Sequence, residues 1–279
     1  MPNNGPPNPA YRLPVADLDF LLRDELRGAR FMLEYEKAEL SLRDWGVRST
    51  VIVFGSARIL PPDIAEAERA AAKGPEAAAQ AERRVALSRY YAEARKFGRI
   101  VSERGGALCS DGNLRDNVIA TGGGPGVMEA ANRGAADAGA PSIGFNIALP
   151  HEQKPNPYST PGLTFQFHYF AMRKMHLAMR ANALVAFPGG FGTFDELFEI
   201  LTLEQTRKAP PAPVVLMGRD YWQRIIDFDA LVEEGMIDDA DLNLFSFADT
   251  AEEAWEALLA NGLRAHTPPE DRPDVGGPL

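Results

Sequence analysis

Short apolar runs alternate with longer stretches of helical periodicity along most of the chain. The first run, STVIVFGSAR over residues 49–58, is rich in β-branched residues and ends in Gly-Ser, which is typical of a buried parallel strand that feeds a loop. An Ala-rich stretch over residues 63–104 then predicts helix, with an interruption near Gly74-Pro75. Strand followed by helix is the unit that the rest of the chain repeats.

Later segments continue this alternation. Residues 117–139, NVIATGGGPGVMEAANRGAADAG, predict a strand, a glycine turn and a helix. Residues 164–170 alternate between apolar and polar side chains, which predicts either a strand or an irregular approach to the helix FAMRKMHLAMRA. The other predicted strands lie at residues 141–149, 183–190, 212–218 and 243–249, and a helix follows each of the last three.

Strands separated by helices of this length predict an α/β fold, a doubly wound Rossmann-like parallel sheet with helices on both faces. We expect one nucleotide-binding domain over residues 49–263. Helical spacing over residues 15–48 predicts an N-terminal helical extension. Residues 1–14 are rich in Pro and Asn and are expected to be disordered, and residues 264–279 are expected to form a loose Pro-rich tail.

Composition narrows the class of protein. A net charge of −10 argues against a general binder of nucleic acids or anionic membranes, although it permits a small anionic ligand in a local pocket. A single cysteine, Cys109, excludes an internal disulfide framework and suits a reducing cytoplasm; we expect it to be buried and inert. The first residues lack the pattern of a signal peptide, and no run approaches the roughly 20 apolar residues of a membrane span.

Three predicted strands end in turns of small residues: FGSAR, ATGGGPG and FPGGFGT. The carboxyl ends of parallel strands share one edge of the sheet, so these turns are expected to border one ligand site. GGGPGVMEAAN matches neither a Walker A loop nor the dinucleotide G-x-G-x-x-G/A pattern. Its glycines still allow backbone N–H groups to approach an anion, while the structural alternative is a tight turn with Pro125 in the first helical turn.

PGGFGT adds a hydroxyl to the glycines. Gly190 and Gly192 open the backbone and Thr193 supplies a donor at a helix start, which suits a phosphate monoester. Thr193 and Glu196 also match the S/T-x-x-E capping box, in which both side chains only satisfy backbone N–H groups. The local sequence does not decide between capping and catalysis for Glu196.

Charged residues elsewhere bear on this choice. Arg173, His176 and Arg180 fall near one face of the predicted helix FAMRKMHLAMRA, either as a solvated basic stripe or as partners for Glu196. His151 and Glu152 follow the strand at 141–149 and face the same edge, although a lone loop histidine is more often structural. The four histidines lack metal-ligand spacing, so no metal site is predicted.

GSAR, GGGPGVMEAAN, MRK and PGGFGTFDE together resemble the LOG family, the nucleoside 5′-monophosphate phosphoribohydrolases formerly labelled lysine decarboxylases, over roughly residues 49–260. The resemblance implies a hydrolase in which Arg173 and Glu196 are the catalytic pair. It implies that Gly190, Gly192 and Thr193 bind the 5′-phosphate. The remaining residues that it places at the nucleotide are Gly55, Ser56, Gly123, Gly124, Gly126, Met172 and Lys174.

The resemblance also implies AMP or an N6-modified AMP as substrate, no cofactor, and at least a homodimer. The sequence departs from the short plant-like members in its GGG turn and in its extension over residues 1–48, and it resembles longer bacterial members. The identity of the base, including any cytokinin, therefore stays open. The alternative is a non-catalytic nucleotide or cofactor carrier that uses the same turns.

Overall fold

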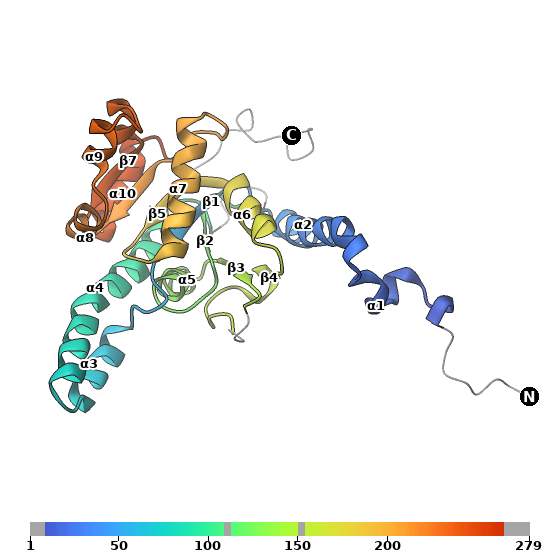
Figure 1. Cartoon of the computed structure of the whole chain (residues 1–279), viewed down its shortest axis with the longest axis horizontal. Helices are drawn as coiled ribbons and strands as arrows, with labels where there is room; N and C mark the ends of the chain where they lie inside the picture. The colour runs from blue at the N-terminus through green and yellow to red at the C-terminus, as the bar shows by residue number, and fades with distance from the viewer. Residues whose placement is uncertain (1–8, 109–112, 150–153, 265–279) are drawn as a thin grey trace, which may run out of the picture.

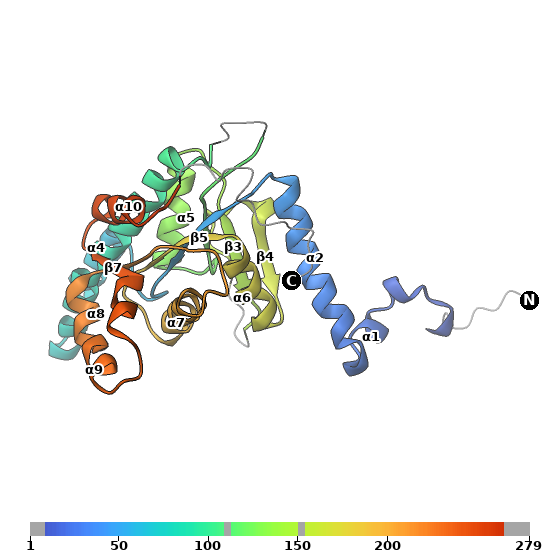
Figure 2. The ribbon, with the colours of Figure 1, turned by 90° about the horizontal axis from the view of Figure 1, so that it is seen from above.

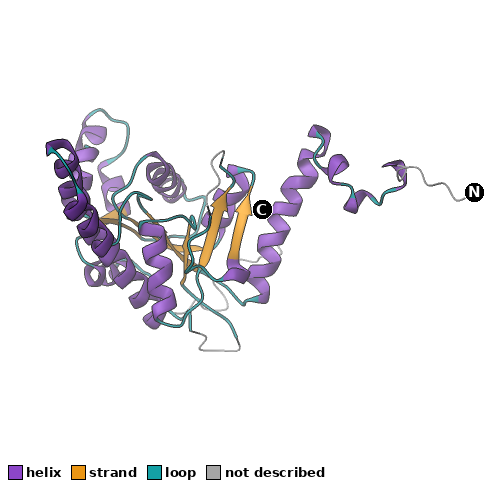
Figure 3. Ribbon diagram, turned by 90° about the horizontal axis from the view of Figure 1, so that it is seen from below, coloured by secondary structure: helices purple, strands orange, loops and turns teal. Residues whose placement is uncertain are grey.

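Within residues 9–108, 113–149 and 154–264, which the computed structural model describes, seven parallel strands form one sheet (Figure 3). Their order is β4-β3-β2-β1-β5-β6-β7. The strands are β1 (Thr50–Phe54), β2 (Val118–Thr121), β3 (Ile143–Ile147), β4 (Thr164–Phe167), β5 (Ala181–Ala186), β6 (Val214–Met217) and β7 (Phe245–Ala248). Residues 164–167, where the sequence left two options, form strand β4.

Helices cover both faces of this sheet, which confirms the predicted doubly wound fold. Figure 2 shows α4, α5 and α10 on one face and α6 and α7 on the other. The helices are α1 (Leu18–Leu21), α2 (Arg27–Asp44), α3 (Pro62–Ala71), α4 (Pro75–Arg104), α5 (Val127–Asp137), α6 (Phe170–Met179), α7 (Phe191–Gln205), α8 (Arg219–Ile225), α9 (Phe228–Glu233) and α10 (Ala251–Ala260). None of the described helices has the length and apolarity needed to span a membrane.

Strand β1 shows why a continuous apolar run is needed at the centre. All five of its residues are buried, and successive side chains point to opposite faces. Val51 and Val53 belong to the core beneath α4 and α5, whereas Ile52 and Phe54 belong to the core beneath α6 and α7. The strand therefore joins two hydrophobic cores, as expected for a parallel sheet covered on both sides.

The predicted break between α3 and α4 falls at Gly74. This glycine has a φ of +87°, and Pro75 starts α4 at a position where a missing N–H group is tolerated. Helix α3 and the first turns of α4 form an arm that projects beyond the sheet, whereas the later turns of α4 pack on it (Figure 1).

The N-terminal extension contacts the rest of the protein through α2. The last turns of α2 bury Ala38, Glu39 and Leu42, whereas residues 9–22 lie away from the sheet (Figure 1). Residues 9–11 and 14–16 form short 3-10 turns, and residues 1–8, like the tail from residue 265, fall outside the described part.

Candidate functional site

The sheet reverses its winding direction at β1, whose neighbours are β2 on one side and β5 on the other. Ligands of open α/β sheets bind at such a switch point, beyond the carboxyl ends of the strands. The turns after β1 and β5 are joined here, because the Ser56 N–H donates to the carbonyl oxygen of Pro188 at 2.9 Å. The Val127 N–H at the start of α5 donates in turn to the carbonyl oxygen of Ser56 at 3.2 Å.

A cleft of about 700 Å³ opens above these turns. That volume is in the range of small-ligand pockets. Six residues that the sequence placed in the site line it: Gly55, Ser56, Arg173, Gly190, Gly192 and Thr193. Apolar walls are added by Phe54, Met128 and Tyr221.

Arg173 lines the cleft and meets Glu196, which is not itself among the described residues that line it, although 23 positions separate the two in sequence. Arg173 Nη2 donates to Glu196 Oε1 at 2.7 Å, and the side chains are only 10% and 4% exposed. Arg173 Nε is buried without a hydrogen-bond partner among the described residues. Burial raises the pKa of Glu196 above its ordinary value, although the charges of Arg173 and Lys174 oppose the shift.

The capping box is not formed. Helix α7 begins at Phe191, two residues before Thr193, and its N-cap is Gly190 with no side-chain cap hydrogen bond. Glu196 is therefore a full turn inside the helix and points to Arg173 instead of the helix start. Its side chain is free of the structural role that competed with catalysis.

The PGG turn (residues 188–190) presents the beginning of α7 to the cleft. The first N–H groups of a helix have no acceptor within it, and no described residue accepts from those of Gly190, Phe191 or Gly192. A Cβ atom at Gly190 or Gly192 would meet nothing within 4 Å, so both residues border open space. These donors and the helix dipole suit a phosphate group.

Gly189 has a different role. A Cβ atom there would lie 2.0 Å from Thr193 Oγ1, so the buried Thr193 side chain packs directly over this glycine. The Tyr221 hydroxyl donates to the carbonyl oxygen of Gly189 and holds the turn from the other side.

The GGG turn (residues 122–124) lies next to Arg173. A Cβ atom at Gly122 would sit 4.0 Å from Arg173 Nη1. Gly123 has a φ of +68° and packs against the Asn146 side chain, and the carbonyl oxygen of Gly124 accepts from Asn156 Nδ2 at 3.2 Å. These glycines shape the wall behind Arg173.

Gly126, with a φ of +73°, lies against the backbone of Ser56 and Ala57. Neither it nor Gly123 or Gly124 is among the described residues that line the cleft. Nucleotide contact by these three glycines stays a prediction.

Met172 and Lys174 flank Arg173 on α6 but point elsewhere. Met172 is partly buried against the core. Lys174 Nζ lies 2.9 Å from Asp195 Oδ1 and 3.0 Å from Glu199 Oε2, on either side of Glu196 in α7. Burial lowers the pKa of Lys174, but hydrogen bonds to Asp195 and Glu199 outweigh it and raise the pKa. Lys174 thus fixes α7 against α6, and its contact with a nucleotide stays a prediction.

Helix α2 holds α6 through contacts that the sequence did not reveal. Glu34 accepts from the backbone N–H groups of His168 at 2.9 Å and Tyr169 at 3.2 Å, directly before α6 begins. Arg30 Nε donates to the Tyr169 hydroxyl at 2.9 Å. At the other end of α6, the buried Arg180 donates to Glu39 at 2.8 Å.

His176 is enclosed between these contacts. Its Nε2–H donates to the carbonyl oxygen of Tyr35 at 3.1 Å, and its ring stacks on that of Tyr35 at 5.3 Å. Burial lowers its pKa to about 4, with the charge of Arg180 adding to the shift. The solvated basic stripe is therefore wrong, because Arg173, His176 and Arg180 are all buried.

His151, Glu152 and Cys109 lie outside the described residues. In the part of the chain that is described, no three His, Cys, Asp or Glu side chains are grouped to hold a metal ion.

Comparison with known proteins matches residues 128–258 to the family described as "possible lysine decarboxylase". The rice (Oryza sativa subsp. japonica) protein named probable cytokinin riboside 5′-monophosphate phosphoribohydrolase LOG4 is 33% identical over 146 residues, which are 51% of this chain and 62% of the relative. The Arabidopsis thaliana cytokinin riboside 5′-monophosphate phosphoribohydrolase LOG4 is 31% identical over 150 residues, which are 52% of this chain and 68% of the relative. The match to the rice protein thus spans less than two thirds of that relative's length.

Among solved structures, the chain is similar to TM1055, an X-ray structure of a structural genomics target. The TM-score is 0.48 and the sequence identity 22%, over 76% of this chain and 99% of the other.

Proposed function

Because the chain belongs to the LOG family, we propose that it hydrolyses the N-glycosidic bond of a nucleoside 5′-monophosphate, AMP or an N6-modified AMP. The products are the free base and ribose 5-phosphate. The observation that carries this proposal is the buried hydrogen bond between Arg173 and Glu196 beside the open PGG turn. The PGGFGTFDE segment supplies both parts, since its glycines border the cleft and its glutamate faces the arginine.

Substrate binding begins with the 5′-phosphate. Its oxygens accept from the N–H groups at the start of α7 and from the Thr193 hydroxyl, where the helix dipole favours negative charge. The phosphate anchors the ribose, so the anomeric carbon is held near Glu196 instead of sampling the cleft. Phe54 and Met128 offer apolar surface for the base.

Glu196 stabilises the positive charge that develops on the ribose during bond cleavage. Breaking the bond between ribose and base produces oxocarbenium character on the sugar, which a nearby carboxylate stabilises. The same carboxylate accepts a proton from the attacking water, whose oxygen bonds to the anomeric carbon while the base takes up a proton. A pKa raised by burial makes Glu196 a better base than an exposed glutamate, and general-base help is typically worth roughly 10²–10⁴-fold.

Arg173 keeps Glu196 oriented and ionised through their hydrogen bond. Arg173 also lines the cleft, where it can contact a polar atom of the substrate. A decarboxylase that forms a Schiff base would need a reactive lysine, and no lysine is among the described residues that line the cleft. Lys174, the nearest in sequence to Arg173, is held by two carboxylates.

The proposal is tested by incubating purified protein with AMP, with adenosine and with other nucleoside monophosphates, and by separating the products by chromatography. Free base is expected from a monophosphate, with kcat/KM at least about tenfold higher for AMP than for adenosine because the phosphate anchors the sugar. Tight AMP binding without base release would instead support a nucleotide carrier. Equal cleavage of AMP and adenosine would show that the PGG turn does not hold the phosphate.

A further inference from the structure

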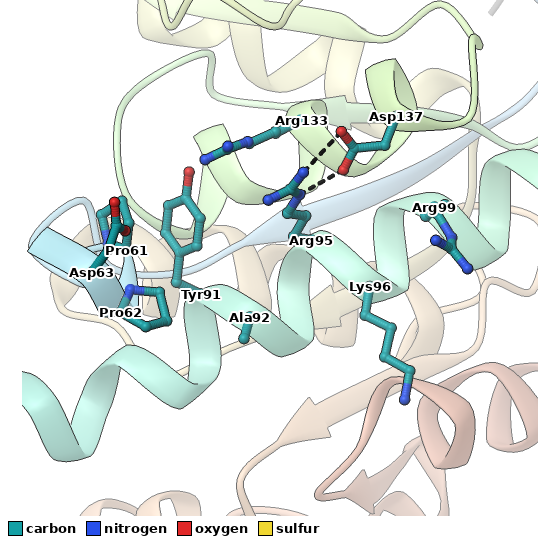
Figure 4. Close-up of a pocket in the computed structure, with 10 residues that line it drawn as sticks. All are labelled: Pro61, Pro62, Asp63, Tyr91, Ala92, Arg95, Lys96, Arg99, Arg133 and Asp137. Carbon is teal, nitrogen blue, oxygen red and sulfur yellow. Dashed lines mark hydrogen bonds and ion pairs between the residues drawn. The ribbon is translucent and has the colours of Figure 1, made fainter.

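A second hollow, of about 580 Å³, lies between α4, α5 and the start of α3 (Figure 4). None of the ten residues that line it lines the cleft above the switch point. Four of the ten are cations (Arg95, Lys96, Arg99 and Arg133), and two are acids (Asp63 and Asp137). This local balance is opposite in sign to the net charge of −10 on the whole chain.

Two of these cations line the hollow from neighbouring helices, Arg95 on α4 and Arg133 on α5 (Figure 4). Arg95 reaches from α4 to Asp137 on α5, with its Nε and Nη2 atoms 2.5 and 3.0 Å from the carboxylate oxygens (Figure 4). Arg133 extends from α5 over Tyr91, and no described carboxylate forms an ion pair with it (Figure 4). Lys96 points away and pairs with Glu252 on α10 at 2.6 Å, so it is not counted as part of the site.

The Arg95–Asp137 pair shows that this hollow can bind an anionic group. The two nitrogen atoms of one guanidinium fork grip two oxygen atoms of one anionic group, which is also how arginine grips a phosphate. Both side chains are a third or more exposed, at 40% and 33%, and a pair this exposed contributes only about 0–1 kcal/mol. An incoming anion with more charge than a carboxylate can therefore share or take over Arg95.

Tyr91 supports the position of Arg133 from below. Its side chain is buried, and its hydroxyl donates to Glu129 Oε1 at 2.7 Å. Burial and this contact raise the pKa of Tyr91 to about 12, so the hydroxyl stays protonated near neutral pH. The guanidinium of Arg133 also lies 5.2 Å from the centre of the Tyr158 ring, so aromatic rings are its close described contacts and no described carboxylate lies within ion-pair distance.

We propose that the hollow between α4 and α5 is a binding site for a small phosphorylated compound, with Arg95 and Arg133 as the groups that hold its phosphate. The two arginines come from different helices and line the same ligand-sized space. Pro61, Pro62 and Ala92 provide apolar surface for the rest of such a compound. The site does not depend on the activity proposed for the cleft.

The test uses the full chain and pyrophosphate as the probe, titrated by calorimetry near neutral pH and at constant ionic strength. Arg133→Ala should weaken binding by at least about tenfold, since a charge-assisted hydrogen bond is lost. Asp137→Asn should tighten binding by roughly two- to tenfold, because it frees Arg95 and removes a like charge. Arg83→Ala is the matched control: Arg83 is an exposed cation on the same helix, outside the hollow, and its loss should change binding less than twofold.

The turn proposed to bind the 5′-phosphate in the cleft is a second place for pyrophosphate, so the titration is repeated with Thr193→Ala and with saturating AMP. Binding that survives both and follows the Arg133 and Asp137 variants supports the site. Binding that is lost in Thr193→Ala or displaced by AMP overturns it, as does an absence of binding or an equal loss in Arg133→Ala and Arg83→Ala. Thermal unfolding of each variant shows that it is folded, and base release from AMP reports separately on the cleft.

Discussion

Replacing Glu34 by Ala tests whether the N-terminal extension positions the helix that carries Arg173. The carboxylate of Glu34 accepts two backbone N–H groups, of His168 and Tyr169, at the start of α6. Loss of a capping acceptor costs about 0.5–2 kcal/mol, and the favourable position of a negative charge at a helix start is worth about 0.3–1 kcal/mol. The half-buried position of Glu34 places the expected loss of unfolding free energy at about 1–2 kcal/mol.

Arg173 lies four residues after Tyr169, so a frayed start of α6 disturbs its hydrogen bond to Glu196. We expect kcat for AMP to fall by up to about tenfold, the kinetic equivalent of 1.4 kcal/mol, with little change in KM because the phosphate turn lies on α7. Urea unfolding and steady-state base release measure the two effects. Glu34→Gln, which keeps one acceptor oxygen, should recover part of kcat.

Glu36→Ala is the matched control, since Glu36 is exposed on the same helix. If Glu34→Ala and Glu36→Ala show the same stability and the same kcat, α2 does not position α6 and the reasoning is refuted.

The other predictions concern the PGG turn, the buried His176 and the loss of activity at low pH. Gly189→Ala should lower stability by about 1–3 kcal/mol in urea unfolding, because its methyl overlaps Thr193, whereas Gly190→Ala should leave stability unchanged and raise KM for AMP; equal effects would contradict this packing. His176 is neutral in the folded protein, because burial lowers its pKa to about 4, so its contribution to the free energy of unfolding is complete above pH 6.5 and falls by about 3 kcal/mol towards pH 4. If a His176→Gln variant keeps the wild-type pH dependence of stability, the titration of His176 does not cause it. Because burial raises the pKa of Glu196, kcat/KM should lose activity on the acid side at a higher pH than an ordinary glutamate titrates, which a pH–rate profile measures.

The sheet was predictable because its signals are local. An apolar run such as TVIVF must be buried on both sides, and a glycine or proline ends it, so β1 and the break at Gly74 follow from short windows of sequence. The order of the strands is not local, but the shared edge of a parallel sheet was enough to bring the turns of small residues together.

The site was predictable only in part, because its decisive contacts join distant segments. The Thr193-x-x-Glu196 spacing predicts a capping box equally well, and only the start of α7 two residues earlier excludes it. The burial of Arg180 depends on Glu39, 141 residues away, and nothing in the spacing of the basic residues on α6 announces that partner. The sequence pattern identified the charged residues, while long-range pairing determined which of them are buried.

The most direct test of the central claim is base release from AMP by Glu196→Gln, measured beside the wild type with purified protein. Gln keeps the size of the side chain and an oxygen that can accept from Arg173, but it carries no charge and cannot take a proton from water. We predict at least about 10²-fold slower release, with thermal unfolding and AMP affinity close to those of the wild type. Release at the wild-type rate by the folded variant would contradict the assignment of Glu196 as the catalytic carboxylate.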